Sequence, residues 1–190
     1  AIKNAQIDVS DIDLILVATM SPESMLPNTA CQIQSIIGAT NATCFDINAA
    51  CSGFLFALNT ANAYITSGMY NTALVIGCET LSKLIDWSDR STCVLFGDGA
   101  GAVVVTRDDS KKYISVTGSD GIKGKVLTGG KTPLKNFLSD DDFVNYNEKD
   151  FYMQMDGQEV FKFAVTKVPE YIKLVLDKSG KKVDDIECCV

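Results

Sequence analysis

The sequence predicts a layered α/β fold. Apolar runs of strand length alternate along the chain with segments whose apolar residues recur at helical spacing, and this alternation is typical of helices packed on a sheet. Two strand-like runs, 73–78 and 100–106, are almost continuously apolar, as in a sheet that is covered on both faces. The composition, with 46% hydrophobic and 22% charged residues, is that of an ordinary globular chain.

Four elements are expected before these two runs: strands at 11–19 and 43–48, and helices at 29–37 and 52–67. The strand segments are rich in β-branched and apolar residues. Each helix ends at a glycine, Gly38 or Gly68, the residue that most easily adopts the left-handed conformation that closes a helix. Within the second helix, one face is expected to be core, because its apolar residues recur at helical spacing at Phe54, Leu58, Ala61 and Ile65.

The rest of the chain is less regular. A weaker strand is expected at 113–117. It is followed by a long surface excursion over 119–150, where glycines, Pro133 and the acidic run 140–142 interrupt both helical and strand spacing of apolar residues. Such a segment is either functional and mobile or a solvated insertion without a role. Helical spacing resumes over 160–176, where Pro169 is expected to kink or divide the helix. Residues 184–190 read as the start of another buried strand.

Charge and composition exclude several classes of function. A net charge of −7 argues against binding to nucleic acid or to an anionic membrane surface, although a local basic patch could still dock an acidic protein. No apolar run approaches the roughly 20 residues that cross a bilayer. The seven cysteines form no C-x-x-C pair, which indicates reduced thiols in a cytoplasm. With no histidine in the chain, a metal site is not expected.

Cys51 is the candidate nucleophile. The segment 49–54, Ala-Ala-Cys-Ser-Gly-Phe, places this cysteine where a strand turns into a helix. A helix N-terminus favours a negative charge by about 0.3–1 kcal/mol, and the thiolate is the nucleophilic form of cysteine. Small neighbours would let a substrate approach the sulfur. A small buried hydrophobic cysteine would fit the same residues, so local sequence leaves both interpretations open.

Six blocks follow one another in the order found in one enzyme family. They are Leu-Val-Ala-Thr at 16–19, Ala-Cys-Gln-Ile-Gln-Ser at 30–35, Phe-Asp at 45–46 leading to 49–54, Asp-Arg at 89–90, Phe-Gly-Asp-Gly-Ala-Gly-Ala at 96–102, and Met-Asp-Gly-Gln-Glu-Val-Phe-Lys at 155–162. This ordered set resembles β-ketoacyl-acyl-carrier-protein synthase III, the initiating condensing enzyme of bacterial fatty acid synthesis in the thiolase superfamily. Because the glycines of the fifth block lack the Lys and Ser or Thr of a phosphate-binding loop, we expect them to form a tight turn beneath the active site.

The resemblance implies a thiolase-like α/β/α/β/α fold built from two similar halves. Residues 1–155 would form the N-terminal half, incomplete at its start and carrying the excursion 119–150, and residues 156–190 would begin the C-terminal half. The chain would then be a central segment, without the family's N-terminal part and without the C-terminal part that bears a catalytic histidine and asparagine. Such a segment is expected to be inactive in condensation on its own.

For function, the resemblance implies an acyltransferase of fatty acid biosynthesis. Cys51 would accept an acyl group from an acyl-coenzyme A primer, with its own backbone N–H in the oxyanion hole, before decarboxylating condensation with malonyl-acyl carrier protein. Coenzyme A thioesters would be substrates, and no cofactor is expected. Two alternatives remain: another acyl-coenzyme A enzyme of the superfamily, such as a hydroxymethylglutaryl-coenzyme A synthase or a polyketide starter synthase, or a non-catalytic remnant that binds a partner.

The resemblance also assigns roles to individual residues, each of which could instead be ordinary core or solvated surface. Substrate and coenzyme A binding would use Arg90, Met155, Gly157 and Gln158. The acyl pocket would be lined by Leu26, Leu81, Phe96, Leu127 and Phe161. Lys162 would dock the acyl carrier protein, and Leu26 would reach across a homodimer into the partner's pocket. Acyl-coenzyme A, malonyl thioesters and the carrier protein are the implied partners, in the cytoplasm.

Overall fold

The computed structural model describes residues 1–110, 112–132 and 147–189. They form two compact units, one made of Ala1–Lys83 with Gly97–Tyr113 and the other of Leu84–Phe96 with Ile114–Val190. Each unit is described by itself. The boundary between residues 155 and 156, which the resemblance implies for two similar halves, stays a prediction.

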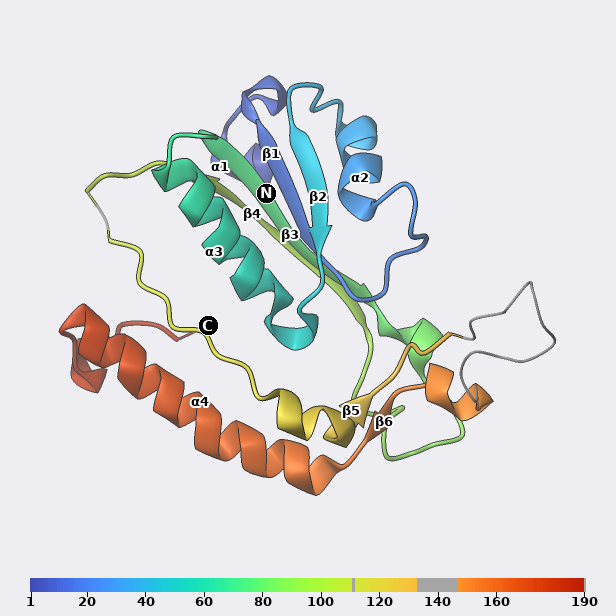
Figure 1. Cartoon of the computed structure of the whole chain (residues 1–190). Coiled ribbons are helices and arrows are strands. Elements are labelled where there is room, and N and C mark those ends of the chain that lie inside the picture. The colour runs from blue at the N-terminus through green and yellow to red at the C-terminus, as the bar shows by residue number, and fades with distance from the viewer. Residues whose placement is uncertain (111, 133–146, 190) are drawn as a thin grey trace. The chain divides into compact units, whose positions relative to one another are not determined.

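The first unit is built on a four-stranded mixed sheet in the order β2-β1-β3-β4 (Figure 1). Its strands are β1 (Leu14–Ala18), β2 (Thr43–Ile47), β3 (Thr72–Thr80) and β4 (Asp98–Thr106). β1 pairs in parallel with both β2 and β3, whereas β4 runs antiparallel to β3. All four strands were expected at these places, so the α/β class is confirmed. The weaker strand expected at 113–117 is wrong, because these residues are extended chain with no neighbouring strand to pair with.

Helices α2 (Thr29–Ile37) and α3 (Gly53–Thr66) also lie where they were expected. The side chain of Asn28 accepts a hydrogen bond of 2.8 Å from the N–H of Cys31 and so caps α2, and Gly38 ends that helix at a φ of 76°. Gly68, at a φ of 77°, follows the end of α3. A short helix, α1 (Ile2–Ala5), opens the chain.

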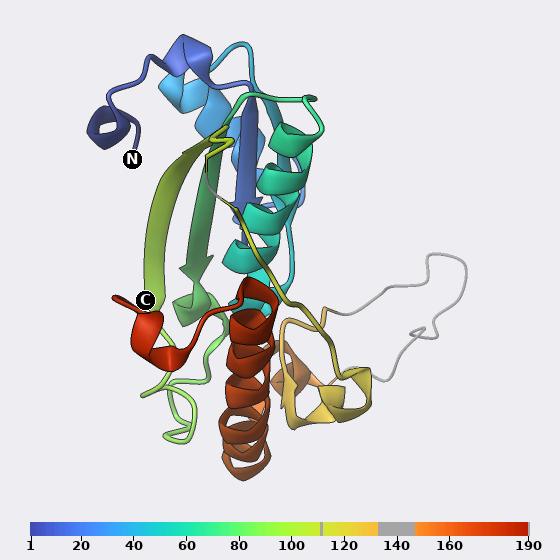
Figure 2. The ribbon, with the colours of Figure 1, turned by 90° about the vertical axis from the view of Figure 1, so that its left-hand side faces the viewer.

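The side chains of β1 divide the core of the first unit in two, because successive residues of a strand point to opposite faces of a sheet. Ile15 and Val17 pack on one face, in a cluster that includes Ala30 of α2. Leu16 packs on the other face, in a cluster that includes Ala57 of α3. Figures 1 and 2 show α3 running along the sheet, where it packs over β1 and β3. A helix on each face is the layering that the sequence predicts.

Strand β4 departs from the prediction in its burial. Its apolar run was expected to be covered on both faces, yet the residues from Asp98 to Val103 are exposed. The side chain of Val103, for example, is 39% exposed to solvent. β4 is the last strand of the sheet and has β3 as its one neighbour. Only its far end contacts the two core clusters, through Val104 and Val105.

The second unit contains the long helix α4 (Gly157–Ser179) and a two-stranded sheet of β5 (Leu127–Thr128) and β6 (Gln154–Met155). The Asp156 carboxylate caps α4 by accepting hydrogen bonds of 3.1 Å from two backbone N–H groups. The expected division at Pro169 is wrong, because α4 continues through it. A proline removes one hydrogen bond of the helix ladder, and the turns on either side hold the segment together.

Two further expectations concern less regular segments. The strand expected at 184–190 is wrong for the described residues, which form a 3-10 turn at Val183–Asp185 and then an irregular end without a strand to pair with. Within the excursion 119–150, the described parts are mostly exposed and contain short 3-10 turns at Gly121–Val126 and Glu148–Phe151. Pro133 and the acidic run 140–142 lie outside the described residues. No helix in the described ranges combines the length and the apolar character of a membrane span.

Candidate active site

Cys51 lies in the tight connection between β2 and α3. A 3-10 turn, Ala50–Ser52, links the two elements, and Ala50 adopts a φ of 45°. This left-handed conformation is uncommon for a residue with a side chain, and it turns the backbone sharply just before the thiol. Gly53 then starts α3 where a Cβ would lie 3.2 Å from the Cβ of Ala18. The glycine therefore lets the start of α3 lie close to the end of β1.

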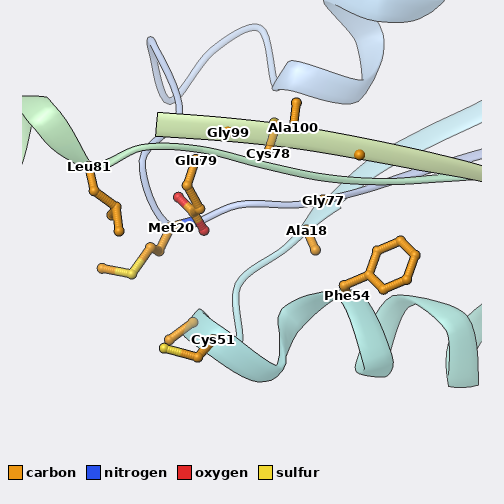
Figure 3. A pocket seen from close by; sticks show the side chains of 12 residues that line it. Ala18, Met20, Cys51, Phe54, Gly77, Cys78, Glu79, Leu81, Gly99 and Ala100 are labelled. Carbon is orange, nitrogen blue, oxygen red and sulfur yellow. The ribbon is translucent and has the colours of Figure 1, made fainter. Parts of the chain in front are cut away.

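The thiol of Cys51 borders a cavity of about 270 Å³ in the first unit (Figure 3). The cavity lies between the start of α3 and the ends of β1 and β3, with the beginning of β4 along one side. It is lined by Ala18, Met20, Ala50, Cys51, Phe54, Gly77, Cys78, Glu79, Leu81, Gly99, Ala100 and Gly101. β1 and β3 are parallel, so their carboxyl ends meet at one edge of the sheet, where α/β proteins commonly bind ligands. The walls are mainly apolar and small, which suits an acyl chain.

Gly77 shapes the wall that faces α3. A Cβ at this position would lie 3.3 Å from the ring of Phe54, so the absence of a side chain lets that ring pack directly on β3. Gly77 and Phe54 line the cavity together with Cys51 (Figure 3).

The described thiols differ in environment. Burial raises the pKa of Cys44 to about 11, and burial, with the nearby Glu79 carboxylate as a smaller cause, raises the pKa of Cys78. Cys51 is exposed and lies at the start of α3. No hydrogen bond found among the described residues uses the backbone N–H of Cys51, so this donor is available to a ligand.

We expect Cys51 to be alkylated before the other six cysteines when the folded chain meets limiting iodoacetamide near neutral pH. The raised pKa values of Cys44 and Cys78 keep those thiols protonated, whereas Cys51 is exposed beside the cavity in the turn that leads into α3. Peptide mapping by mass spectrometry measures the order in which the cysteines are alkylated. The control is the chain unfolded in denaturant, because unfolding removes the differences in environment among the thiols. Faster labelling of Cys93, or of the exposed Cys31 or Cys188, in the folded chain would contradict the assignment of the nucleophile.

Within the first unit, the structure places two expected pocket residues differently. Leu81 lines the cavity together with Cys51, as the resemblance implies. Leu26 does not line it: its side chain is 87% exposed, beside the equally exposed Met25. An exposed position fits the role of reaching another subunit, and that role stays a prediction.

The other expected site residues belong to the second unit. Leu127 of β5 pairs with Met155 of β6, and Gly157 and Gln158 form the first turn of α4. Phe161 is 66% exposed on α4, and Phe96 is partly buried. The ammonium group of Lys162 pairs with Glu159 at 2.6 Å, which raises the lysine pKa. Arg90 lies in the turn region 84–96 and is exposed. The roles of these residues stay predictions.

The glycine-rich block 97–101 does not form the expected tight turn. Gly99 and Gly101 lie in β4, where they pair with Glu79 and Gly77 of β3. Their missing side chains leave room along one side of the cavity. At the start of β4, the Asp98 carboxylate accepts hydrogen bonds from the backbone N–H and the hydroxyl of Ser82, which lies in the 3-10 turn after β3.

Two residues that line the cavity, the flexible Met20 and the charged Glu79, were not predicted from the sequence. Met20 follows β1 and Glu79 is near the end of β3. The signal that could have found them is the parallel pairing of these strands, since residues at the carboxyl ends of neighbouring parallel strands come together.

Three comparisons relate the chain to known proteins. Residues 45–121, which include Cys51, match the family described as 3-oxoacyl-[acyl-carrier-protein] synthase III. The β-ketoacyl-[acyl-carrier-protein] synthase III of Clostridium acetobutylicum is 48% identical over 191 residues, which is 100% of this chain and 58% of that protein. The chain thus spans less than two thirds of the length of this relative.

Solved structures agree in fold. The crystal structure of 3-oxoacyl-[acyl-carrier-protein] synthase III from Aquifex aeolicus matches with a TM-score of 0.83 and 40% identity, over 98% of this chain and 55% of that one. The β-ketoacyl-[acyl carrier protein] synthase III of Thermus thermophilus matches with a TM-score of 0.84 and 33% identity, over 97% of this chain and 56% of that one. The described chain therefore has the thiolase-like fold of these enzymes.

Proposed function

We infer that this chain belongs to the β-ketoacyl-[acyl-carrier-protein] synthase III family, and we propose that Cys51 accepts the acyl group of an acyl-coenzyme A primer in fatty acid biosynthesis. The identity of 48% along the whole chain supports the family. The exposed thiol at the edge of an apolar cavity, at the start of α3, is the observation that carries the role of Cys51.

In this proposal, the first step is a transthioesterification. The Cys51 thiolate attacks the carbonyl carbon of the thioester, and the carbonyl oxygen becomes an oxyanion that accepts a hydrogen bond from the backbone N–H of Cys51. The bond between the carbonyl carbon and the sulfur of coenzyme A then breaks. Coenzyme A leaves as a thiolate and takes up a proton, and the acyl group stays on Cys51.

The second step is condensation with a malonyl thioester. Loss of carbon dioxide leaves a carbanion that attacks the acyl-Cys51 carbonyl, and Cys51 leaves as a thiolate. Hydrogen-bond donors on the malonyl carbonyl stabilise the developing negative charge. The resemblance gives this task to a histidine and an asparagine, and the 190-residue chain has no histidine. We therefore propose that this chain carries the acyl-transfer half of the chemistry.

We propose the remaining roles on the same basis. Coenzyme A thioesters and malonyl-acyl carrier protein are the substrates, and the transfer itself needs no cofactor. The carrier protein would dock near Lys162, and a homodimer would form through the exposed loop of Leu26 and Met25. The seven unpaired cysteines suit a reducing cytoplasm.

Incubation of the 190-residue chain with acetyl-coenzyme A tests the first step. We expect a mass increase of one acetyl group, mapped to the peptide that contains Cys51, because this thiol is the nucleophile beside the cavity. The variant Cys51→Ala should stay unmodified, whereas the matched control Cys31→Ala, which removes another exposed cysteine, should be acetylated as the parent chain is. Acetylation that persists in Cys51→Ala would refute the assignment.

A further inference from the structure

A compact polar cluster lies beside the cavity and has no part in the chemistry proposed above. Glu79, near the end of β3, accepts hydrogen bonds from three consecutive residues that follow β1. The backbone N–H of Met20 donates at 2.9 Å to one carboxylate oxygen, and the hydroxyl of Ser21 donates at 2.5 Å to the other. The hydroxyl of Thr19 donates at 3.4 Å to that second oxygen. We call Glu79 with residues 19–21 the Glu79 clamp.

Further hydrogen bonds from Thr80 and Lys83 hold Ser21 of the Glu79 clamp in place. The Ser21 hydroxyl accepts a hydrogen bond of 2.8 Å from the N–H of Thr80, and the Thr80 hydroxyl donates at 3.1 Å to the Ser21 carbonyl. The ammonium group of Lys83 donates at 3.0 Å to the same carbonyl. Thr19 and Ser21 are 6% and 8% exposed, so these polar groups depend on one another for their hydrogen bonds. A partly buried network of this kind, with its polar groups paired, holds its members in one arrangement.

Met20 and Glu79 both line the cavity, and Met20 is the member of the clamp that brings a long apolar side chain to it. Its side chain lines the same cavity as Cys51 and Leu81, and Figure 3 shows it between Glu79 and the thiol. A methionine side chain is long and flexible, so by itself it would not define a wall. The hydrogen bond from its backbone N–H to Glu79 fixes where that side chain begins.

We propose that Glu79 is a positioning residue that acts through Met20: it holds Met20 as a wall of the cavity and thereby sets the length of acyl chain that Cys51 accepts. This inference rests on the proposed function. Glu79 is not placed in the acyl-transfer chemistry, because its carboxylate oxygens bind residues 19–21 and no hydrogen bond found among the described residues joins it to Cys51.

The test compares acyl chains rather than overall rates. The rates at which acetyl- and hexanoyl-coenzyme A acylate Cys51 are measured by mass spectrometry on the 190-residue chain, and their ratio removes any general change in thiol reactivity. Met20→Ala should raise the ratio of hexanoyl to acetyl transfer by about tenfold or more, because it enlarges an apolar pocket by several heavy atoms. Glu79→Ala should shift the ratio in the same direction. Glu79→Gln, which keeps an oxygen for the N–H of Met20, should shift it less.

The double variant Met20→Ala/Glu79→Ala is the decisive member of the series. If Glu79 acts through Met20, the double variant should show the ratio of Met20→Ala alone, since the effects of residues that work as one unit are not additive. Glu23→Ala is the matched control, because its side chain is exposed in the same segment and has no part in the proposed site, and it should leave the ratio unchanged. If the Glu79→Ala variant does not fold, the inference is tested by comparing the ratio of hexanoyl to acetyl transfer in Glu79→Gln with that in the parent chain.

A second probe separates this inference from the proposed function. N-ethyl and N-hexyl iodoacetamide alkylate a thiol without any acyl-transfer chemistry, so the ratio of their rates at Cys51 reports the shape of the cavity alone. If no thioester acylates the parent chain, the proposed function fails, and the alkylation ratio then tests the clamp in the same variants. An unchanged ratio in both Glu79 variants, with either set of probes, would overturn the inference. A shift matching that of Met20→Ala would support it.

Discussion

The 190-residue chain, supplied with acetyl-coenzyme A and malonyl-acyl carrier protein, is expected to form acetyl-Cys51 and to release no acetoacetyl product. The chain has the proposed nucleophile, Cys51, but no histidine, and each missing hydrogen-bond donor of this kind typically costs about a hundredfold to a thousandfold in rate. Product formation is measured by mass spectrometry of the carrier protein, with Cys51→Ala as the background.

A relative such as the synthase of Clostridium acetobutylicum serves as the positive control for this assay, since the chain spans 58% of that protein. Product at about 1 per second from the 190-residue chain, an ordinary enzymatic rate, would show that the described chain holds its own donors for the second step. The proposed division of the chemistry would then be wrong.

Replacing Leu16 by alanine is expected to lower the free energy of unfolding by about 2–5 kcal/mol. Leu16 lies in the middle of β1, is fully buried, and packs in the cluster beneath α3. Its loss leaves a cavity that the surrounding strands can only partly fill. Because β1 leads into Thr19 and Met20, the same change should also slow acylation of Cys51.

Leu55→Ala is the matched control, since Leu55 is on α3 and 60% exposed, and its effect should stay within about 0.5 kcal/mol. Urea denaturation followed by circular dichroism measures both variants. Equal losses of stability in the two variants would contradict the assignment of β1 as the centre of the core.

Elements defined by nearby residues could be predicted closely from the sequence. Helix α2 has the bounds that the sequence predicts, because its signals are local: Asn28 caps the first turn and Gly38 ends the last. β4 was predicted as a strand but not as an exposed one, since burial depends on what covers a sheet edge. Pro169 shows the opposite case, in which a strong local signal is outweighed by the rest of a long helix.

The same distinction between features set by nearby residues and features set by distant ones holds for the candidate site. The position of Cys51 between a strand and a helix could be predicted, because a strand, small residues and a helix follow one another within a few positions. The Glu79 clamp could not, because Glu79 and Met20 are far apart in the sequence and meet only when β1 and β3 pair in parallel. The exposure of Leu26 likewise depends on which surfaces of the chain find a neighbour.

The strand order has a consequence for how the protein is made. β1 is flanked by two parallel partners, and each partner is reached only after an intervening helix has been synthesised. A parallel pair cannot close as a local hairpin, so a nascent chain on the ribosome carries the fully apolar β1 unpaired until β2 and then β3 emerge. Folding of this unit therefore waits for translation, and during that interval the apolar side chains of β1 have no strand or helix to pack against.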